Sequence, residues 1–249
     1  MRLMPVDAKL AFRLEVYAAL DSTSTTLKQR AEAGEAEGLA IQAQRQSAGR
    51  GRQGRGWESP LGNLYLSVLL RPGVPLREAP QWSFVAAVAL AETLLPLLPE
   101  TVQPSLKWPN DVLLRGVKLA GILVETGITA DHALDWICVG IGANVTNKPK
   151  LPDRATSCLA EYSPNPPTPQ ALAAALLHNL GHWHEARLAQ GFAPIRDAWL
   201  RHGPAMGAAV SVKRDGALIE GNFAGLSPEG ALKLAKGRQI QLILDGEII

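Results

Sequence analysis

The chain has 249 residues, of which 47% are hydrophobic and 19% are charged. A chain of this length buries roughly three-quarters of the surface of its unfolded form, enough for one large domain and one small domain. Its formal net charge of +2 is too small to indicate a general nucleic-acid or membrane partner. The two cysteines, Cys138 and Cys158, are not in a metal-binding spacing and are typical of a reduced cytoplasmic protein, so we expect no structural disulfide.

The amino-terminal residues mix charged with apolar side chains and lack the hydrophobic block of a signal peptide. The longest apolar stretch, residues 84–98, is too short to span a bilayer. We therefore expect a cytoplasmic protein without a membrane partner.

Hydrophobic periodicity predicts helices and strands in alternation. The expected elements are a capped helix at 21–33, strands at 39–45 and 63–70, a buried helix at 80–98, strands at 117–126 and 134–145, and helices at 169–190 and 192–201. A helix between two sheet regions indicates an α+β fold.

From residue 208 the pattern changes to short apolar runs separated by turn pairs such as Asp215-Gly216. These runs predict four or five short strands, the size of a small β-barrel. We place the boundary near Gly203-Pro204, which gives domains at 1–203 and 204–249.

Residues 49–57, GRGRQGRGW, carry no core-forming side chain before Trp57. Glycines let a backbone approach a ligand closely, and guanidinium groups offer paired donors that suit phosphate or carboxylate. The segment buries too little apolar surface to offset the entropy of ordering. We therefore expect a loop that orders around a phosphorylated or adenylated ligand.

Three other interpretations of this segment are possible, and the sequence disfavours two of them. A dinucleotide-binding fingerprint requires a helix directly after the glycines, whereas residues 57–63 are loop sequence. A disordered RNA-binding tail is disfavoured by the interior position of the segment. A solvated surface loop stays open from this segment alone.

Two lysines are placed where they could meet an anion. Lys107 precedes the sequence WPND, whose proline and turn residues put it at a strand end facing a cavity. In the following strand, alternation predicts that Lys118, Ala120 and Ile122 share one face. A lysine on an apolar strand face either extends to water or meets an anion. We expect Lys118 to face an anionic ligand without a buried protein partner.

Four motifs occur in the order and spacing of the biotin protein ligases, and the chain resembles this family from about residue 12 to its end. The motifs are GRGRQGRGW at 49–57, KWPND at 107–111, KLAGILVE at 118–125 and GIGAN at 140–144. The resemblance implies a mixed catalytic sheet packed with helices, similar to class II synthetases, followed by a small SH3-like β-barrel.

The resemblance also implies a reaction in two steps. Biotin and ATP form biotinyl-5′-adenylate and pyrophosphate, and the acyl group then passes to one lysine of a biotin carboxyl carrier domain. ATP and biotin would be the substrates and Mg²⁺ the activator on the phosphates. The carrier domain would be the protein partner, and the resemblance leaves open whether the chain forms a homodimer.

Matching the family residue by residue gives catalytic roles to Lys118 and Arg52. Substrate-binding roles fall on Ser22, Thr23, Ser24, Gln46, Gly49, Arg50, Gly51, Arg52, Trp57, Lys107, Lys118, Gly121 and Asn144. Within this set, Ser22, Thr23, Gln46 and the loop backbone would contact biotin, and Asn144 and Trp57 would contact adenine. Asp111 either coordinates Mg²⁺ or caps its turn, and the sequence does not decide between these roles.

Two features differ from other members of the family. Ser24 stands where many of them carry asparagine, so one hydroxyl replaces an amide beside the biotin ring. Some members also carry an amino-terminal helix-turn-helix. Here only about ten residues precede the catalytic pattern, too few for a DNA-reading motif, so we expect no DNA partner.

Other candidate sites are weaker. His178 and His182 share a helical face close to His184, but no carboxylate of a metalloenzyme pattern accompanies them, and we expect no metal there. Trp82, Trp136, Trp183 and Trp199 are predicted to be core or interface residues.

Two rival functions follow from the same residues. Lipoate-protein ligases perform the same adenylation on another acyl group, and the glycine–arginine loop together with KWPND favours the biotin branch. A non-enzymatic anion-binding or RNA-binding module is disfavoured, because Lys118 and Asn144 lie outside the basic loop and match the same site.

Overall fold

The computed structural model describes residues 10–149 and 155–249, so positions 1–9 of the predicted catalytic domain and positions 150–154 lie outside the described residues. In chain order the elements are β1 (Arg13–Tyr17), α1 (Thr23–Glu32), β2 (Leu39–Ala43), β3 (Leu64–Leu70), α2 (Gln81–Leu94), β4 (Pro104–Lys107), β5 (Asp111–Leu114), β6 (Val117–Ile128), β7 (Leu134–Ala143), α3 (Pro169–Gln190), α4 (Ala193–His202), β8 (Ala209–Arg214), β9 (Ala217–Leu226), β10 (Leu232–Lys236), β11 (Gln239–Ile243) and β12 (Glu247–Ile248).

The large sheet is mixed and has the strand order β1-β2-β3-β7-β6-β5-β4. β1 and β2 run parallel, with α1 as their crossover, and the other neighbours are antiparallel. A parallel pair needs such a crossover, whereas antiparallel neighbours can be joined by short turns. The α+β prediction is therefore confirmed.

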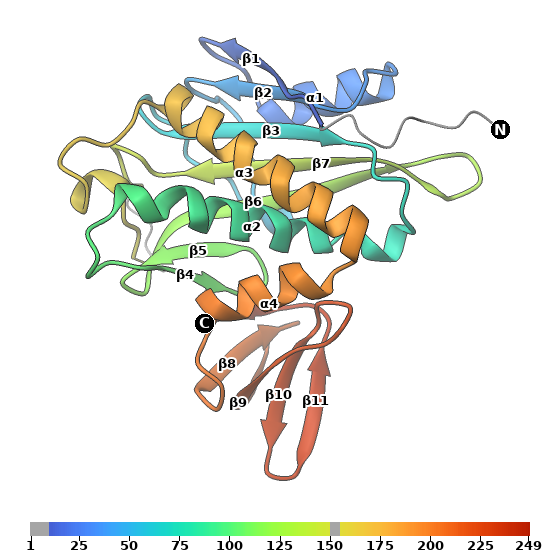
Figure 1. Cartoon of the computed structure of the whole chain (residues 1–249), viewed down its shortest axis with the longest axis vertical. Coiled ribbons are helices and arrows are strands. Elements are labelled where there is room, and N and C mark those ends of the chain that lie inside the picture. The colour runs from blue at the N-terminus through green and yellow to red at the C-terminus, as the bar shows by residue number, and fades with distance from the viewer. Residues whose placement is uncertain (1–9, 150–154) are drawn as a thin grey trace.

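The two faces of this sheet are covered differently. α2 and α3 cross one face side by side (Figure 1) and bury the main hydrophobic core against it. On the opposite face α1 packs over a smaller cluster that includes Leu27, Ile41, Leu69 and Trp136. Because α1 is short, the middle of that second face is left for the site described below.

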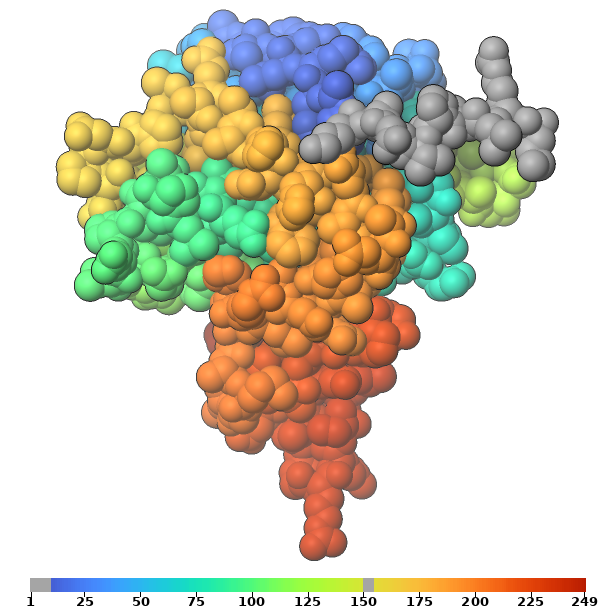
Figure 2. Space-filling model, in the orientation of Figure 1, coloured from blue at the N-terminus to red at the C-terminus, as the bar shows by residue number. Residues whose placement is uncertain are grey.

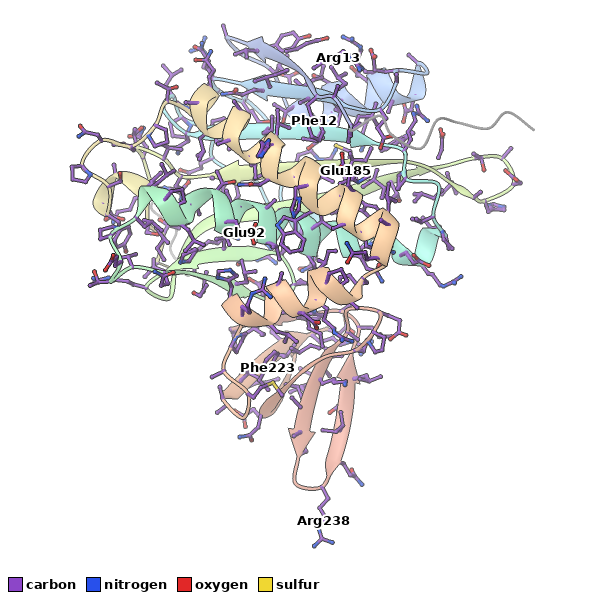
Figure 3. All side chains as sticks on the ribbon, in the orientation of Figure 1. Phe12, Arg13, Glu92, Glu185, Phe223 and Arg238 are labelled. Carbon is purple, nitrogen blue, oxygen red and sulfur yellow. The ribbon has the colours of Figure 1, made fainter. Side chains whose placement is uncertain are left out.

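A smaller antiparallel sheet with the order β11-β10-β9-β8-β12 follows α4. The molecule narrows toward this part (Figure 2), and the β10–β11 hairpin ends at Arg238 (Figure 3). Aromatic rings join the two parts: the Phe84 ring centroid lies 5.8 Å from that of Trp199, and Trp199 lies 6.4 Å from Phe223. The small sheet thus shares a continuous apolar core with the large one.

The elements predicted from periodicity agree with the structure. The predicted helices correspond to α1, α2, α3 and α4, and the predicted strands to β2, β3, β6, β7 and the strands of the small sheet described within residues 204–249. The tryptophans named above are buried. β1, β4 and β5 are missing from the prediction. None of the residues of β1 is fully buried, so it carries no clear apolar alternation, and β4 and β5 are only four residues long each. In the described part of the chain, no helix combines the length and apolar character needed to cross a bilayer.

A buried histidine joins α2 to α3. The Trp82 indole N–H donates to His184 Nδ1 at 3.0 Å, and His184 Nε2 lies 3.5 Å from a Glu37 carboxylate oxygen. Since Nδ1 accepts a hydrogen bond, the neutral ring carries its proton on Nε2, facing Glu37. Burial lowers the pKa of His184 to about 4, and the nearby Arg187 guanidinium acts in the same direction.

This pKa predicts that the free energy of unfolding falls as pH decreases from about 6.5 to about 4. In that range the His184 side chain gains a proton in the unfolded chain and stays neutral in the folded one. The loss reaches roughly 3 kcal/mol and levels off below pH 4. His184→Gln accepts from Trp82 without titrating and removes this component. Urea unfolding across this pH range measures it, with His178→Gln, an exposed histidine of α3, as the control that keeps the wild-type slope. Equal slopes in wild type and His184→Gln would contradict the assignment.

Candidate active site

A cavity of about 330 Å³ lies beside α1 on the second face of the large sheet. Its floor is formed by β6 and the carboxy-terminal end of β7, where Gly121 pairs with Gly142. A β-carbon on Gly142 would lie 2.6 Å from the Trp57 ring, and one on Gly140 would lie 2.8 Å from the Ser24 hydroxyl. These separations are shorter than real carbon contacts, so the cavity exists because the strands carry no side chains there.

One end of the cavity is lined by hydroxyl and amide groups. The Thr23 backbone N–H donates to Gln46 Oε1 at 2.8 Å, and Gln46 Nε2 donates to the Ser59 hydroxyl at 2.9 Å. The Ser67 hydroxyl lies 2.8 Å from that of Thr23 and 3.1 Å from that of Ser24. These contacts orient uncharged donors and acceptors toward one end of the cavity.

The start of α1 contributes to the same end. Ser22 is the N-cap residue, and its hydroxyl accepts a hydrogen bond from the Thr25 backbone N–H at 3.4 Å. Ser22, Thr23 and Ser24 are buried and all line the cavity. The helix therefore fixes three successive hydroxyl residues at the wall with its amino terminus directed at the site.

The glycine–arginine loop, residues 49–57, forms a hydrogen-bonded hairpin over the cavity. The Trp57 backbone N–H donates to Gly49 O at 2.9 Å, and Gly51 N–H donates to Arg55 O at 2.7 Å. The half-buried Trp57 ring lies over the glycine floor, with Lys118 Nζ 5.5 Å from its centroid. The loop has more internal structure than its composition predicts, and its ordering by a ligand stays a prediction.

The anionic residue Asp111 lies between two lysines. Lys118 Nζ is 2.6 Å from one carboxylate oxygen of Asp111, and Lys107 Nζ is 3.7 Å from the other. The Asp111 side chain is 3% exposed. The expectation that Lys118 has no buried protein partner is therefore wrong. Lys107 Nζ also lies 3.9 Å from a Glu247 carboxylate oxygen, so two carboxylates face the two ammonium groups. The arginines of the loop that line the cavity add the positive charge for an anionic ligand.

A β-bulge directs Lys118 into the cavity. Val112 of β5 pairs with Ala120 of β6, whereas the next β5 residue, Leu113, pairs with Lys118. Partners across strands share a face, and consecutive β5 residues alternate, so Lys118 and Ala120 point to opposite faces. The prediction that Lys118 shares a face with Ala120 and Ile122 is therefore wrong. The extra residue in β6 places Lys118 Nζ 3.3 Å from a β-carbon built on Gly121.

The other end of the cavity carries polar atoms that have no protein partner. Asn144 Nδ2 donates to the Ser157 carbonyl at 2.9 Å, which fixes the orientation of the amide. Its Oδ1 and the Trp57 Nε1 are buried, and within the described residues neither has a hydrogen-bond partner. Because unpaired buried polar atoms are costly, these two atoms indicate contacts to a bound molecule.

The structure brings most of the predicted site residues to this one cavity. The predicted residues that line it are Ser22, Thr23, Ser24, Gln46, Arg50, Gly51, Arg52, Trp57, Asp111, Lys118, Gly121 and Asn144. Gly49 lies at the base of the loop, where a β-carbon would be 2.3 Å from Trp57 O, and Lys107 lies behind Asp111. Their roles as ligand contacts stay predictions.

Sequence reasoning left several lining residues unassigned. Gly140 and Gly142 belong to a motif that it quoted, and their spacing of two in a buried strand could have identified them as floor positions. Glu247 lines the cavity from the far end of the chain, where no motif pointed to it. Only the tertiary structure brings that residue to the site.

The structure shows where the candidate metal ligands lie. His184 is paired with Trp82, whereas His178 and His182 are exposed. Residues 10–149 and 155–249 contain no cluster of three or more side chains that could hold a metal ion. Both carboxylate oxygens of Asp111 face lysines, and its role toward Mg²⁺ stays a prediction.

Together these features suit a molecule that is uncharged and polar at one end and anionic in another part. Residues 16–144 match the biotin/lipoate A/B protein ligase family. The chain is 35% identical over 207 residues to a biotin–acetyl-CoA-carboxylase ligase from Paracoccus denitrificans, covering 80% of this chain and 86% of that protein. The chain therefore belongs to the biotin/lipoate A/B protein ligase family.

Two further relatives extend the likeness. The bifunctional ligase/repressor BirA of Escherichia coli is 36% identical over 239 residues, covering 94% of this chain and 72% of that protein. The structure of biotin protein ligase from Aquifex aeolicus in complex with biotin and ATP superposes with a TM-score of 0.78 and 28% identity. That superposition covers 95% of this chain and 97% of the other. The likeness confirms the predicted fold, including the small carboxy-terminal domain.

The glycine floor generates a prediction about the loop. Gly142→Ala places a β-carbon where the Trp57 ring lies, so the ring must leave the floor and the hairpin loses its apolar anchor. Amide hydrogen exchange across residues 50–57 should become faster than in wild type, measured by mass spectrometry. Gly56→Ala is the control, because a β-carbon there meets nothing within 4 Å. Unchanged exchange in Gly142→Ala would show that the floor does not hold the loop.

Proposed function

We propose that this chain is an ATP-dependent biotin–protein ligase. The biotin carboxylate attacks the α-phosphorus of ATP, a C–O–P linkage forms and pyrophosphate leaves. The ε-amine of a carrier lysine then attacks the acyl carbon, forms an amide, loses a proton and releases AMP. The observation that carries the proposal is a single cavity with an uncharged polar end, a glycine floor, and a lysine-rich middle next to an unpaired asparagine oxygen.

The uncharged end suits the ureido ring of biotin. A urea presents one carbonyl acceptor and two N–H donors, and the hydroxyls of Ser22, Thr23 and Ser24 supply both kinds of partner. The Gln46 amide is already engaged with Thr23 and Ser59, so it holds the wall in place. Ser24 reaches Ser67 at 3.1 Å and faces the floor, which supports a hydroxyl contact in place of an amide contact.

The middle of the cavity suits the reacting groups. A carboxylate attacking a phosphate brings two anions together, and the barrier falls when fixed cations neutralise them. Lys118 is positioned by its 2.6 Å contact with Asp111, and Arg50 lies on the loop above. Lys107, 3.7 Å from Asp111, adds positive charge from behind. This arrangement lets Lys118 contact the carboxylate and the phosphate.

The end near Asn144 suits adenine. The unpaired Asn144 Oδ1 is an acceptor for the exocyclic amine, and the Trp57 ring offers an aromatic face for stacking. An adenine lying there would pair one buried atom that the protein leaves unpaired.

Mg²⁺ supplies further neutralisation of the phosphate charge when it is bound. The described residues offer Asp111 as one carboxylate in the cavity, and Mg²⁺ characteristically takes one or two carboxylates together with phosphate oxygens and water. The chain's contribution is therefore to position nucleotide phosphates that carry the ion.

We propose a biotin carboxyl carrier domain as the protein partner, which agrees with the name of the relative from Paracoccus denitrificans, a biotin–acetyl-CoA-carboxylase ligase. Homodimer formation, the cytoplasmic location and the absence of a DNA partner stay predictions.

The decisive experiment incubates the purified chain with biotin, MgATP and a carrier domain and probes for protein-bound biotin with streptavidin. Label on the carrier that requires ATP supports the proposal. A parallel reaction with lipoate distinguishes the other branch of the family, and transfer of lipoate in preference to biotin would overturn the assignment. Binding of ATP without release of pyrophosphate would favour a non-enzymatic anion-binding module.

Lys118 provides a separate test of the charge arrangement. Lys118→Ala should lower adenylate formation at least about 100-fold, measured by pyrophosphate release. It should also destabilise the protein by roughly 2 kcal/mol, because Asp111 is left buried beside the more distant Lys107. The double variant Lys118→Ala/Asp111→Asn should regain the stability and remain inactive. Recovery of activity in the double variant would mean that Lys118 acts only by satisfying Asp111.

Arg52 tests the role of the loop in retaining the intermediate. A mixed anhydride reacts with any amine, so selective transfer requires that the closed loop hold it until the carrier docks. Arg52→Gly removes one anchor and adds backbone freedom, and it should still consume ATP while biotinylating serum albumin. A streptavidin blot compares it with wild type and with Arg238→Gly, which lies at the distant hairpin tip (Figure 3). Adenylate formation without extra albumin labelling would contradict this role.

A further inference from the structure

The arginines of the loop reach past the large sheet to the carboxy-terminal segment. Arg52 Nη2 donates to Asp245 Oδ1 at 2.9 Å, and its Nη1 lies 3.4 Å from Gly246 O. Arg55 Nη2 donates to Glu247 Oε2 at 2.8 Å. Residues 244–246 join β11 to β12, and Glu247 begins β12. The small sheet therefore supplies most of the groups that anchor the tip of the loop, while Arg52 Nη1 also donates to Asn110 Oδ1 at 3.4 Å.

The backbone holds Asp245 in a fixed position. The following residue, Gly246, has φ +139, and a β-carbon on it would lie 2.8 Å from Val212 Cγ1. β12 pairs with β8, and Ile248 N–H donates to Trp108 O at 3.4 Å. The segment is therefore tied to the small sheet and to the KWPND turn at once, and Asp245 presents its carboxylate from a firm support.

The arginines of the loop meet acidic side chains on both the large-sheet side and the small-sheet side. The loop carries arginines and no acidic residue between positions 49 and 57. On the large-sheet side, Arg50 Nη2 lies 3.7 Å from Glu125, and on the small-sheet side Arg52 meets Asp245. The Asp245 side chain is 61% exposed. An exposed pair of this kind shifts the equilibrium between the open and closed loop by about fivefold at most, enough to bias the loop toward closure and too little to lock it.

We propose that Asp245 is a positioning residue that latches the loop through Arg52 and so sets how long the activated acyl intermediate is retained. This inference rests on the proposed ligase function. It gives the small carboxy-terminal domain a role in selectivity: its carboxylate keeps the loop closed until a carrier lysine arrives. Asp245 does not line the cavity and acts on the intermediate only through Arg52.

The test variant is Asp245→Asn, which keeps the shape and removes the charge. Adenylate formation should stay within about twofold of wild type, while release of adenylate and labelling of serum albumin rise about two- to fivefold, as expected from an exposed ion pair. Asp215→Asn is the matched control, because Asp215 is exposed in the same domain and its ion pair is with the neighbouring Arg214. Thermal melting should be the same for all three proteins.

A double variant separates the latch from a general structural effect. Asp245→Asn combined with Arg52→Gly should leak no more than Arg52→Gly alone, because Arg52→Gly already removes the contact to Asp245. In wild type the leak should increase with salt, and in Asp245→Asn this dependence should shrink. Additive leaks, or albumin labelling by Asp245→Asn at the wild-type level, would overturn the proposal.

Hydrogen exchange tests the latch without any substrate. Amides of residues 50–57 should exchange about two- to fivefold faster in Asp245→Asn than in wild type and Asp215→Asn. If wild type forms no adenylate, the ligase proposal fails and the exchange experiment still decides whether Asp245 holds the loop. Equal exchange in all three proteins would overturn the latch even when the enzyme is active.

Discussion

Gly121, Gly140 and Gly142 leave a strip of the central sheet without side chains, and the site depends on this strip. A sheet face that is fully covered by side chains packs against a helix, as the other face does against α2 and α3. On the glycine strip a ligand and the Trp57 ring can instead lie directly on the backbone. The short α1 then contributes its amino-terminal hydroxyls at the margin of the strip, so one constraint organises both the floor and the wall.

The second organising contact is the Asp111 carboxylate between Lys118 and Lys107. It joins β5 to β6 at the bulge and fixes an ammonium group beside the floor. A buried carboxylate loses its hydration, and nearby cations compensate for that loss. The fold brings both lysines to Asp111. The same contact therefore serves the stability of the hairpin and the position of the reactive charge.

Much of the fold could be predicted from local patterns, and the site could be predicted where its residues fall in recognisable motifs. Ser22 as a helix cap, the almost continuous apolar run of α2 and the apolar period of α3 are local features. The direction of Lys118 could not be predicted, because alternation assumes an unbroken strand and the bulge becomes visible only through pairing with β5. The place of Glu247 at the cavity depends on packing between sheets distant in sequence, for which the chain carries no local pattern.

The contact between Arg52 and Asp245 joins residues 193 positions apart in the chain. Contacts of such long sequence separation exist only when both sheets are folded and docked through the aromatic rings of Phe84, Trp199 and Phe223. When the small sheet detaches in a partial unfolding event, Arg52 loses this carboxylate while the large sheet remains intact. Such partly unfolded copies have lost one contact that favours closure of the loop, so the loop opens in them more often than in the intact molecule.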